Sequence, residues 1–212
     1  EGEAPGEGSL PVLRHDFAVL AIPGQPDPAN AAGVVAVIAR AVRLVQEGKA
    51  SALCTAPINK KVLKDGAGFA FPGHTEYLAH LAGVSRVVMM LTCPGLRVVP
   101  ATIHIPLSEV PAALTEQLLE ETIRITHAGL IRDFGIAAPR LAIAALNPHA
   151  GEDGRMGDEE ARIIAPAIAA LRAAGIDASG PHPADALFAP RARGGYDVAL
   201  CMYHDQALIP IK

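Results

Sequence analysis

Short apolar runs that alternate with stretches of helical periodicity are the feature that most constrains the fold of this 212-residue chain. Runs of strand type occur at residues 17–22, 52–55, 87–91, 98–103, 141–146 and 198–202. Helical patterns occur at residues 30–48, 76–81, 107–134 and 159–174. This alternation is typical of α/β proteins, in which helical crossovers join parallel strands. The pattern therefore predicts a parallel-rich sheet with flanking helices.

Charge and hydropathy exclude several classes of partner. The chain has 18 Lys and Arg residues and 22 Asp and Glu residues, and the two signs are interspersed. No basic face that could follow a phosphate backbone is indicated, so we expect no nucleic-acid partner. No apolar run approaches the roughly 20 residues that cross a bilayer, and the N-terminus lacks the order of a signal peptide. We therefore expect a cytoplasmic protein without a membrane partner.

Three histidines share one topological position. His104, His149 and His204 each lie one to three residues beyond the end of a predicted buried strand. In open α/β sheets this edge is where ligands bind. Three protein ligands and one open position are the usual arrangement of a catalytic zinc ion, and imidazole is its commonest ligand. For each histidine alone a hydrogen-bonded loop residue is the more ordinary interpretation, but their common placement makes a shared metal site an equal alternative for the set of three.

Two aspartates are candidates for acid–base chemistry. Asp205 follows His204 directly, so its carboxylate could orient a metal-bound imidazole or accept a proton from a substrate alcohol. It could also simply cap the next turn. Asp185 follows a proline-rich turn and could reach the same site, although capping the next helix is its more ordinary role.

A possible anion site precedes the helical pattern at residues 76–81. His74 and Thr75 lie where free backbone N–H groups and the positive end of a helix dipole favour a phosphate. Lys60 could add a full positive charge. Neither stretch is a Walker loop or a GxGxxG dinucleotide motif. Thr75 as a simple N-cap and Lys60 as a solvated turn residue therefore remain alternatives.

Six segments of the chain, taken together, resemble the 4-hydroxythreonine-4-phosphate dehydrogenase family. They are TAPINK (55–60), GHTE (73–76), ATIHIPL (101–107), LNPHAGEDGRMG (146–157), GPHPAD (180–185) and MYHDQ (202–206). Their order and spacing match, and the resemblance covers nearly everything from residue 17 to residue 212. Six motifs in register are far more specific than any one of them.

The resemblance implies a fold related to isocitrate and isopropylmalate dehydrogenases, with the active-site cleft at the interface of a homodimer. It implies oxidation of 4-phosphooxy-L-threonine by NAD or NADP, followed by decarboxylation to 3-amino-2-oxopropyl phosphate. A divalent metal, whether zinc, magnesium, cobalt or manganese, would be held by ligands that both subunits contribute. The implied metal ligands are His104, His149 and His204, and the implied substrate contacts are His74, Thr75 and Lys212. Candidates for proton transfer, in no firm order, are Asp185, Asp205 and Lys212.

Three other functions stay open at this point. A paralogous dehydrogenase acting on 4-phospho-threonate or 4-phospho-erythronate would have the same metal site. A phosphate acyltransferase would share the broad architecture but need no metal, and a metal- or phosphate-binding module would have no activity.

Family members also carry segments on both sides of the matched region. We therefore expect residues 1–212 to be the central part of a two-lobed α/β enzyme, without its N-terminal and C-terminal segments. The residues that bind the cofactor, and that would discriminate NAD from NADP, are left unassigned.

Overall fold

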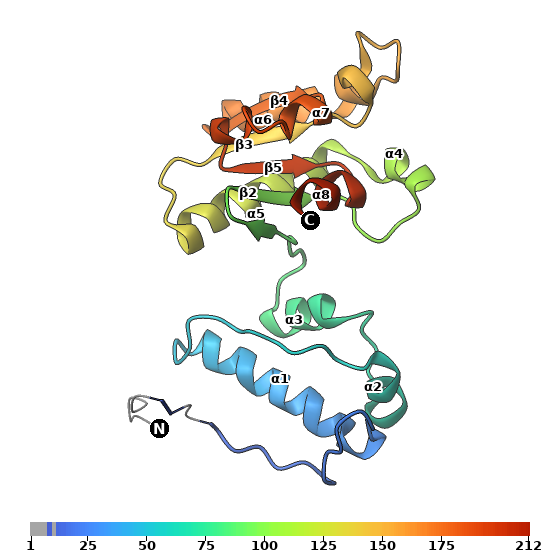
Figure 1. The fold of residues 1–212 in the computed structure, drawn as a ribbon, viewed down its shortest axis with the longest axis vertical. Coiled ribbons are helices and arrows are strands. Elements are labelled where there is room, and N and C mark those ends of the chain that lie inside the picture. The colour runs from blue at the N-terminus through green and yellow to red at the C-terminus, as the bar shows by residue number, and fades with distance from the viewer. Residues whose placement is uncertain (1–7, 10–11) are drawn as a thin grey trace. The chain divides into compact units, whose positions relative to one another are not determined.

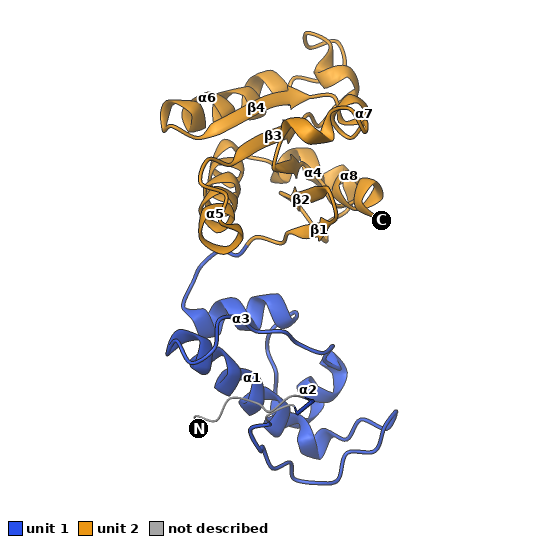
Figure 2. Ribbon diagram, turned by 60° about the vertical axis from the view of Figure 1, so that its left-hand side comes forward, with its two compact units in different colours: residues 1–87 blue, residues 88–212 orange. Residues whose placement is uncertain are grey.

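The computed structural model describes residues 8–9 and 12–212, and it divides into two compact units (Figure 2). Unit 1 is Glu1–Val87 and unit 2 is Val88–Lys212. Each unit encloses buried apolar side chains of its own. Their cores are therefore separate packing units.

Unit 1 is built from helices around a small core (Figure 1). Its elements are the 3₁₀ helix η1 (Pro28–Asn30) and the helices α1 (Ala31–Gln46), α2 (Lys60–Ala67) and α3 (His74–Ala82). The Asn59 side chain caps α2 by accepting a hydrogen bond from the Val62 N–H at 3.1 Å. Glycines in the left-handed conformation end α2 and α3. The buried core residues are Ala31, Ile38, Leu63, Phe69 and Tyr77.

The strands predicted at residues 17–22 and 52–55 are wrong. Among the described residues of unit 1, the only β pairing is the isolated bridge between Ile22 and Gln25. Leu20 is 87% exposed and Ile22 is 53% exposed. A strand is stable only when its N–H and C=O groups pair with another strand, and these apolar runs have no such partner among residues 8–9 and 12–87.

Helix α1, together with η1, is long and apolar enough to cross a membrane by length and composition alone, over Pro28–Gln46. The expectation that no run approaches that length is therefore wrong for this segment. One such helix is weak support for a membrane span, because a core helix of a globular protein passes the same test. Ala31 and Ile38 of α1 are buried against residues of α2 and α3.

Unit 2 contains a five-stranded sheet in the order β1-β2-β5-β3-β4. The pairing of β1 with β2 is antiparallel and the other three pairings are parallel. The strands are β1 (Leu91–Cys93), β2 (Leu96–Pro100), β3 (Arg140–Ala144), β4 (Asp177–His182) and β5 (Val198–Cys201). The predicted mixed α/β fold with a mostly parallel sheet is confirmed.

Helices cover both faces of this sheet. Alternate side chains of the central strand β5 point to opposite faces, and each set lies in a different core. Val198 and Leu200 of β5 belong to the core that the helices α5 and α6 complete. Ala199 and Cys201 belong to the core that α7 and α8 complete. All four side chains are 0% exposed, as expected for a strand buried on both faces.

The helical elements of unit 2 lie between its strands and after the last one (Figure 1). They are η2 (Leu107–Glu109), α4 (Val110–Ala113), α5 (Glu116–Phe134), η3 (Pro148–Gly151), the π-helical turn η4 (Glu160–Ile164), α6 (Ala165–Ala173), α7 (Ala184–Leu187), η5 (Arg193–Gly195) and α8 (His204–Ile211).

Two sequence-based expectations for the strands of unit 2 fail at the edges of the sheet. The strand predicted at 87–91 is wrong for most of its length, because β pairing begins only at Leu91. Strand β4 was not predicted, because its Gly180-Pro181 pair has the composition of a turn. Proline is tolerated there because β4 is an edge strand that pairs with β3 alone.

Candidate functional site

The three histidines singled out by the sequence follow the carboxyl ends of three neighbouring strands. His104, His204 and His149 come after β2, β5 and β3, which are parallel and adjacent in the sheet. Parallel neighbours bring their carboxyl ends to the same edge. The strand order thus gathers the loops that carry all three histidines at one edge of unit 2, where ligands bind in open α/β sheets.

Two of these imidazoles lie close together. The ring centroids of His104 and His204 are 5.9 Å apart, with an angle of 44° between the ring planes. They line a cavity of about 290 Å³. Its lining residues are Ile103, His104, Ile105, Leu107, Val110, Tyr203, His204 and Asp205. The cavity therefore combines apolar walls with two imidazoles and one carboxylate.

Asp205 fixes the orientation of the His204 ring. His204 Nδ1 lies 2.6 Å from Asp205 Oδ1. An ionised carboxylate only accepts hydrogen bonds, so in the neutral imidazole this contact places the proton on Nδ1 and leaves the Nε2 lone pair for a ligand. This arrangement is the one by which carboxylates orient metal-binding histidines. The hydrogen bond is the contact that the first of the three roles considered for Asp205 requires, and the role itself stays a prediction.

His149 lies in the loop after β3 and is exposed. It is not among the residues that line the His104–His204 cavity. Within residues 8–9 and 12–212, no group of three or more His, Cys, Asp or Glu side chains is close enough to hold a metal ion. A single chain thus brings two of the three predicted ligands together, and the role of His149 stays a prediction.

Two buried polar side chains tie the three strand ends to one another. Thr102 Oγ1 donates to the Met202 carbonyl at 2.7 Å, which joins the segment after β2 to the segment after β5. Gln206 accepts from the Met202 N–H at 2.7 Å and donates to the Ala145 carbonyl at 2.6 Å. It therefore joins the segment after β5 to the segment after β3. These positioning residues were not predicted, although buried polar side chains beside strand ends are the signal that marks them.

The remaining acid–base candidates lie outside this cavity. Asp185 is exposed in the first turn of α7, and the N-cap of that helix is Pro183. The alternative in which Asp185 caps the helix is therefore wrong. Lys212 is exposed at the end of α8. Neither residue is among those lining the cavity, so their catalytic roles stay predictions.

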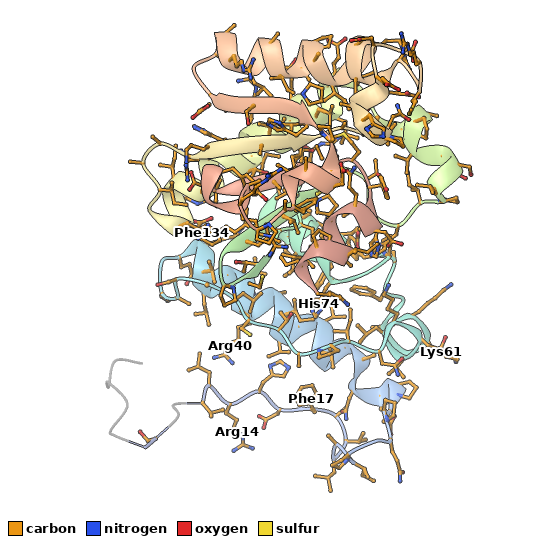
Figure 3. The ribbon with its side chains drawn as sticks, turned by 45° about the horizontal axis from the view of Figure 1, so that its top comes forward. Arg14, Phe17, Arg40, Lys61, His74 and Phe134 are labelled. Atoms are coloured by element: carbon orange, nitrogen blue, oxygen red, sulfur yellow. The ribbon has the colours of Figure 1, made fainter. Side chains whose placement is uncertain are left out.

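The residues of the predicted anion site lie at the start of α3 in unit 1, and their role stays a prediction. His74 is the first residue of this helix, and Gly73 is its N-cap, so Thr75 is not the cap. The side chain of His74 is labelled in Figure 3. Its Nε2 atom is buried without a hydrogen-bond partner among the described residues. Lys60 Nζ would be 3.5 Å from a Cβ placed on Gly73. Glu76 Oε2 would be 3.2 Å from the same Cβ, so the N-terminus of α3 has an ammonium group and a carboxylate close to Gly73, with an unpaired imidazole nitrogen on the next residue.

A second cavity of unit 2, about 330 Å³, lies beside β4 and α7. His182 Nε2 and Ser179 Oγ line it and are 2.9 Å apart. Burial lowers the pKa of His182, and the positive charge of Arg172 lowers it further. The imidazole is therefore held in its neutral form, which suits a hydrogen bond with a serine hydroxyl.

A mostly parallel sheet with helices on both faces, and imidazoles beside a carboxylate at its carboxyl edge, places the chain in the α/β class, in which ligands commonly bind at that edge. The sequence model of the family described as "Pyridoxal phosphate biosynthetic protein PdxA" matches residues 2–212. The chain belongs to this family.

Individual relatives agree with this assignment. The 4-hydroxythreonine-4-phosphate dehydrogenase of Paracoccus denitrificans (strain Pd 1222) is 66% identical over 215 residues, covering 100% of this chain and 67% of the relative. A crystal structure of the enzyme of that name from Klebsiella pneumoniae has a TM-score of 0.84 at 42% identity, covering 89% of this chain and 56% of that one.

A solved structure with a different name is also similar. A terephthalate 1,2-cis-dihydrodiol dehydrogenase from Burkholderia xenovorans LB400 has a TM-score of 0.73 at 31% identity, covering 91% of this chain and 60% of that one. The chain thus spans between about half and two thirds of the length of these three proteins.

Proposed function

We propose that the protein acts as a metal-dependent, NAD- or NADP-linked dehydrogenase of 4-phosphooxy-L-threonine, whose oxidation is followed by decarboxylation to 3-amino-2-oxopropyl phosphate. The observation that carries this proposal is the His104–His204 pair, 5.9 Å apart at the carboxyl edge of the sheet, with Asp205 on His204 Nδ1. Two imidazoles with one oriented ring suit zinc or cobalt, and magnesium and manganese are the alternatives that family resemblance adds.

The metal is proposed to be held by His104, His149 and His204, with ligands drawn from both subunits of a homodimer. This donor set suits the 5.9 Å separation of the His104 and His204 rings, and the Asp205 contact at Nδ1 leaves Nε2 of a neutral His204 ring for the metal. When bound, a divalent cation lowers the pKa of a coordinated hydroxyl and stabilises the negative charge that develops during oxidation and decarboxylation. Asp185, Asp205 and Lys212 are the proposed proton-transfer groups.

The phosphate of the substrate is proposed to bind at the N-terminus of α3. His74 Nε2 offers an unpaired hydrogen-bonding atom there, and Lys60 supplies a positive charge close to Gly73. Thr75 is exposed in the first turn of the same helix and is the third proposed contact. Free N–H groups at a helix N-terminus favour a phosphate dianion.

The fold is proposed to be of the isocitrate and isopropylmalate dehydrogenase type, with the active-site cleft at the dimer interface and a cytoplasmic location. Residues 1–212 are proposed to be the central part of the two-lobed enzyme. Three other substrates compete with this assignment. The related metal site would serve 4-phospho-threonate or 4-phospho-erythronate equally well, and one solved relative is named for a cis-dihydrodiol.

Reduction of NAD or NADP, followed at 340 nm, tests the proposal with each of these substrates in turn. We expect turnover with 4-phosphooxy-L-threonine, loss of it on chelation, and its return with zinc, cobalt, magnesium or manganese. A clear preference for another substrate would overturn the substrate assignment. Turnover that resists chelation would overturn metal dependence. No reduction of NAD or NADP with any of these substrates would overturn the dehydrogenase assignment and favour a metal-independent phosphate acyltransferase-like protein.

A further inference from the structure

Glu160 is the only charged side chain that is buried within residues 8–9 and 12–212; it is 6% exposed. A buried carboxylate is costly unless hydrogen bonds replace its water. Oε1 accepts from the Leu146 N–H at 2.9 Å and from the Asn147 N–H at 2.7 Å. Oε2 accepts from Asn147 Nδ2 at 3.0 Å. All three donors belong to the segment that leaves β3 toward His149.

That segment has a backbone conformation that needs outside support. His149, Ala150, Glu152 and Asp153 have φ values of 53°, 54°, 44° and 56°, in the left-handed region. Residues with a Cβ are disfavoured there and stay only where their surroundings hold them. The loop at residues 147–157 is therefore held by its contacts rather than by its intrinsic preferences.

The loop folds closely around the Glu160 carboxylate. A Cβ placed on Gly151 would come within 2.8 Å of Glu160 Oε2, so a side chain at this position would displace the carboxylate. Glu160 also begins the π-helical turn η4. Such turns are rare in proteins overall, and those that occur are often at functional sites. The Glu160 carboxylate is thus in contact with the start of the loop, through residues 146 and 147, and with its middle, at Gly151.

We propose that Glu160 is a positioning residue that fixes the loop at residues 147–157, and with it the His149 imidazole, for binding of a divalent cation. The role of His149 in this statement rests on the proposed function. Glu160 itself touches neither substrate nor metal. Its effect passes through the N–H groups of Leu146 and Asn147.

Three variants of the whole protein test this inference: Glu160→Ala, Glu160→Gln and Glu152→Gln. Glu160→Ala removes all three acceptor contacts. Glu160→Gln keeps an oxygen for the two backbone N–H groups and sets its NH₂ group against Asn147 Nδ2. Glu152→Gln is the matched control, because it removes a carboxylate from the same loop at an exposed position. No side-chain hydrogen bond of Glu152 is found in the described part of the chain.

Two readouts separate positioning from general stability. Isothermal titration with Co²⁺ measures the affinity of the metal site, and amide hydrogen exchange measures the order of residues 146–157. For Glu160→Ala we expect Co²⁺ affinity to fall about 10- to 100-fold, with faster exchange confined to this loop. For Glu160→Gln we expect a loss of about three- to tenfold. Glu152→Gln should match the wild type in both measurements.

The outcomes that overturn the inference are distinct from those that overturn the proposed function. A folded Glu160→Ala variant with wild-type Co²⁺ affinity and a protected loop would contradict the positioning role. If Glu160→Ala does not fold, Glu160→Gln decides, and wild-type behaviour in both readouts contradicts the inference. A wild-type protein that binds no Co²⁺ would overturn the proposed metal site, whereas hydrogen exchange would still test whether Glu160 orders the loop.

Discussion

Units 1 and 2 both contain apolar runs of strand type, but such a run is a buried strand in unit 2 and an exposed segment without strand pairing in unit 1. In unit 2, residues 198–201 form β5, and Val198 and Leu200 are fully buried. In unit 1, the run at 17–22 forms no strand, and Leu20 is 87% exposed. An apolar run therefore specifies a buried strand only where neighbouring strands satisfy its backbone groups.

The candidate ligand sites of the two units differ in whether their histidines have hydrogen-bond partners within the protein. In unit 2 the His204 ring is already oriented by Asp205, and the strand ends around it are joined by Thr102 and Gln206. In unit 1 the Nε2 atom of His74 is buried without a partner among the described residues. The first site is organised by its own side chains, whereas the second has a polar atom that a ligand can pair with.

Replacing one histidine in each unit should separate these roles most strongly. His204→Ala is expected to lower kcat/KM about a hundredfold or more and to weaken metal binding, because a metal ligand is lost. His74→Ala is expected to raise KM for the phosphorylated substrate while leaving metal affinity unchanged. Steady-state kinetics and Co²⁺ titration of both variants test the split. An equal loss of Co²⁺ affinity in both variants would contradict the assignment of metal binding to His204 and phosphate binding to His74. His127→Ala, on α5, is the control.

Truncating one leucine in each unit tests the contrast in packing. Leu200 is 0% exposed at the centre of the sheet, so Leu200→Ala should lower the free energy of unfolding by about 2–5 kcal/mol. Leu20→Ala should change it by less than about 0.5 kcal/mol, because this side chain is exposed. Urea denaturation of both variants gives the two values. A loss of similar size at Leu20 would show that the apolar run of unit 1 is covered in the folded protein.

Removing the carboxylate that orients His204 should have a smaller effect than removing His204. Asp205→Ala is expected to weaken Co²⁺ binding about 10- to 100-fold, because the imidazole loses the partner that fixes its tautomer and orientation. Calorimetric titration measures the change. Unchanged affinity would mean that the 2.6 Å hydrogen bond has no role in ligand binding.

The smallest expected effect concerns the response of unit 2 to acid. Hydrogen bonds from Arg140, supported by its positive charge, lower the pKa of Asp197. Folding therefore favours the ionised form, so its contribution is complete above the unfolded pKa of about 3.9 and is lost as the pH falls through the lower folded value. Stability should decline below about pH 4, and the decline should be shallower in Asp197→Asn.

Thermal unfolding across pH 2–6 measures this response. Asp65→Asn is the matched control in unit 1, since the Lys61–Asp65 pair is exposed and screened by solvent. An identical acid response of Asp197→Asn and the wild type would contradict the assignment to Asp197.

Prediction from the sequence succeeded for elements whose local pattern agrees with their packing and strand pairing in the folded protein. Helix α1, strand β5 and the common edge of the three histidines followed from periodicity and from the positions of strand ends. Strand β4 was missed, because its Gly180-Pro181 pair is tolerated only at an edge of the sheet, and strand order cannot be read from composition.

The supporting residues of the site were harder to predict than the histidines. Glu160 and Thr102 act through backbone groups of other segments, 13 or 14 residues away for Glu160 and 100 for Thr102. No local pattern encodes such a contact. His149 was predicted as a ligand from its place after a strand. The sequence did not predict that its loop has left-handed backbone conformations, which need support from contacts with other residues.

A crystal structure of the assembled protein grown with Co²⁺ or Zn²⁺, with the ion located by anomalous diffraction, tests the central claim most directly. The account predicts one ion bonded at about 2.0–2.1 Å to the imidazoles of His104, His149 and His204, whether they come from one chain or from two. An ion bound elsewhere, or these imidazoles held far apart in the assembled protein, would contradict it.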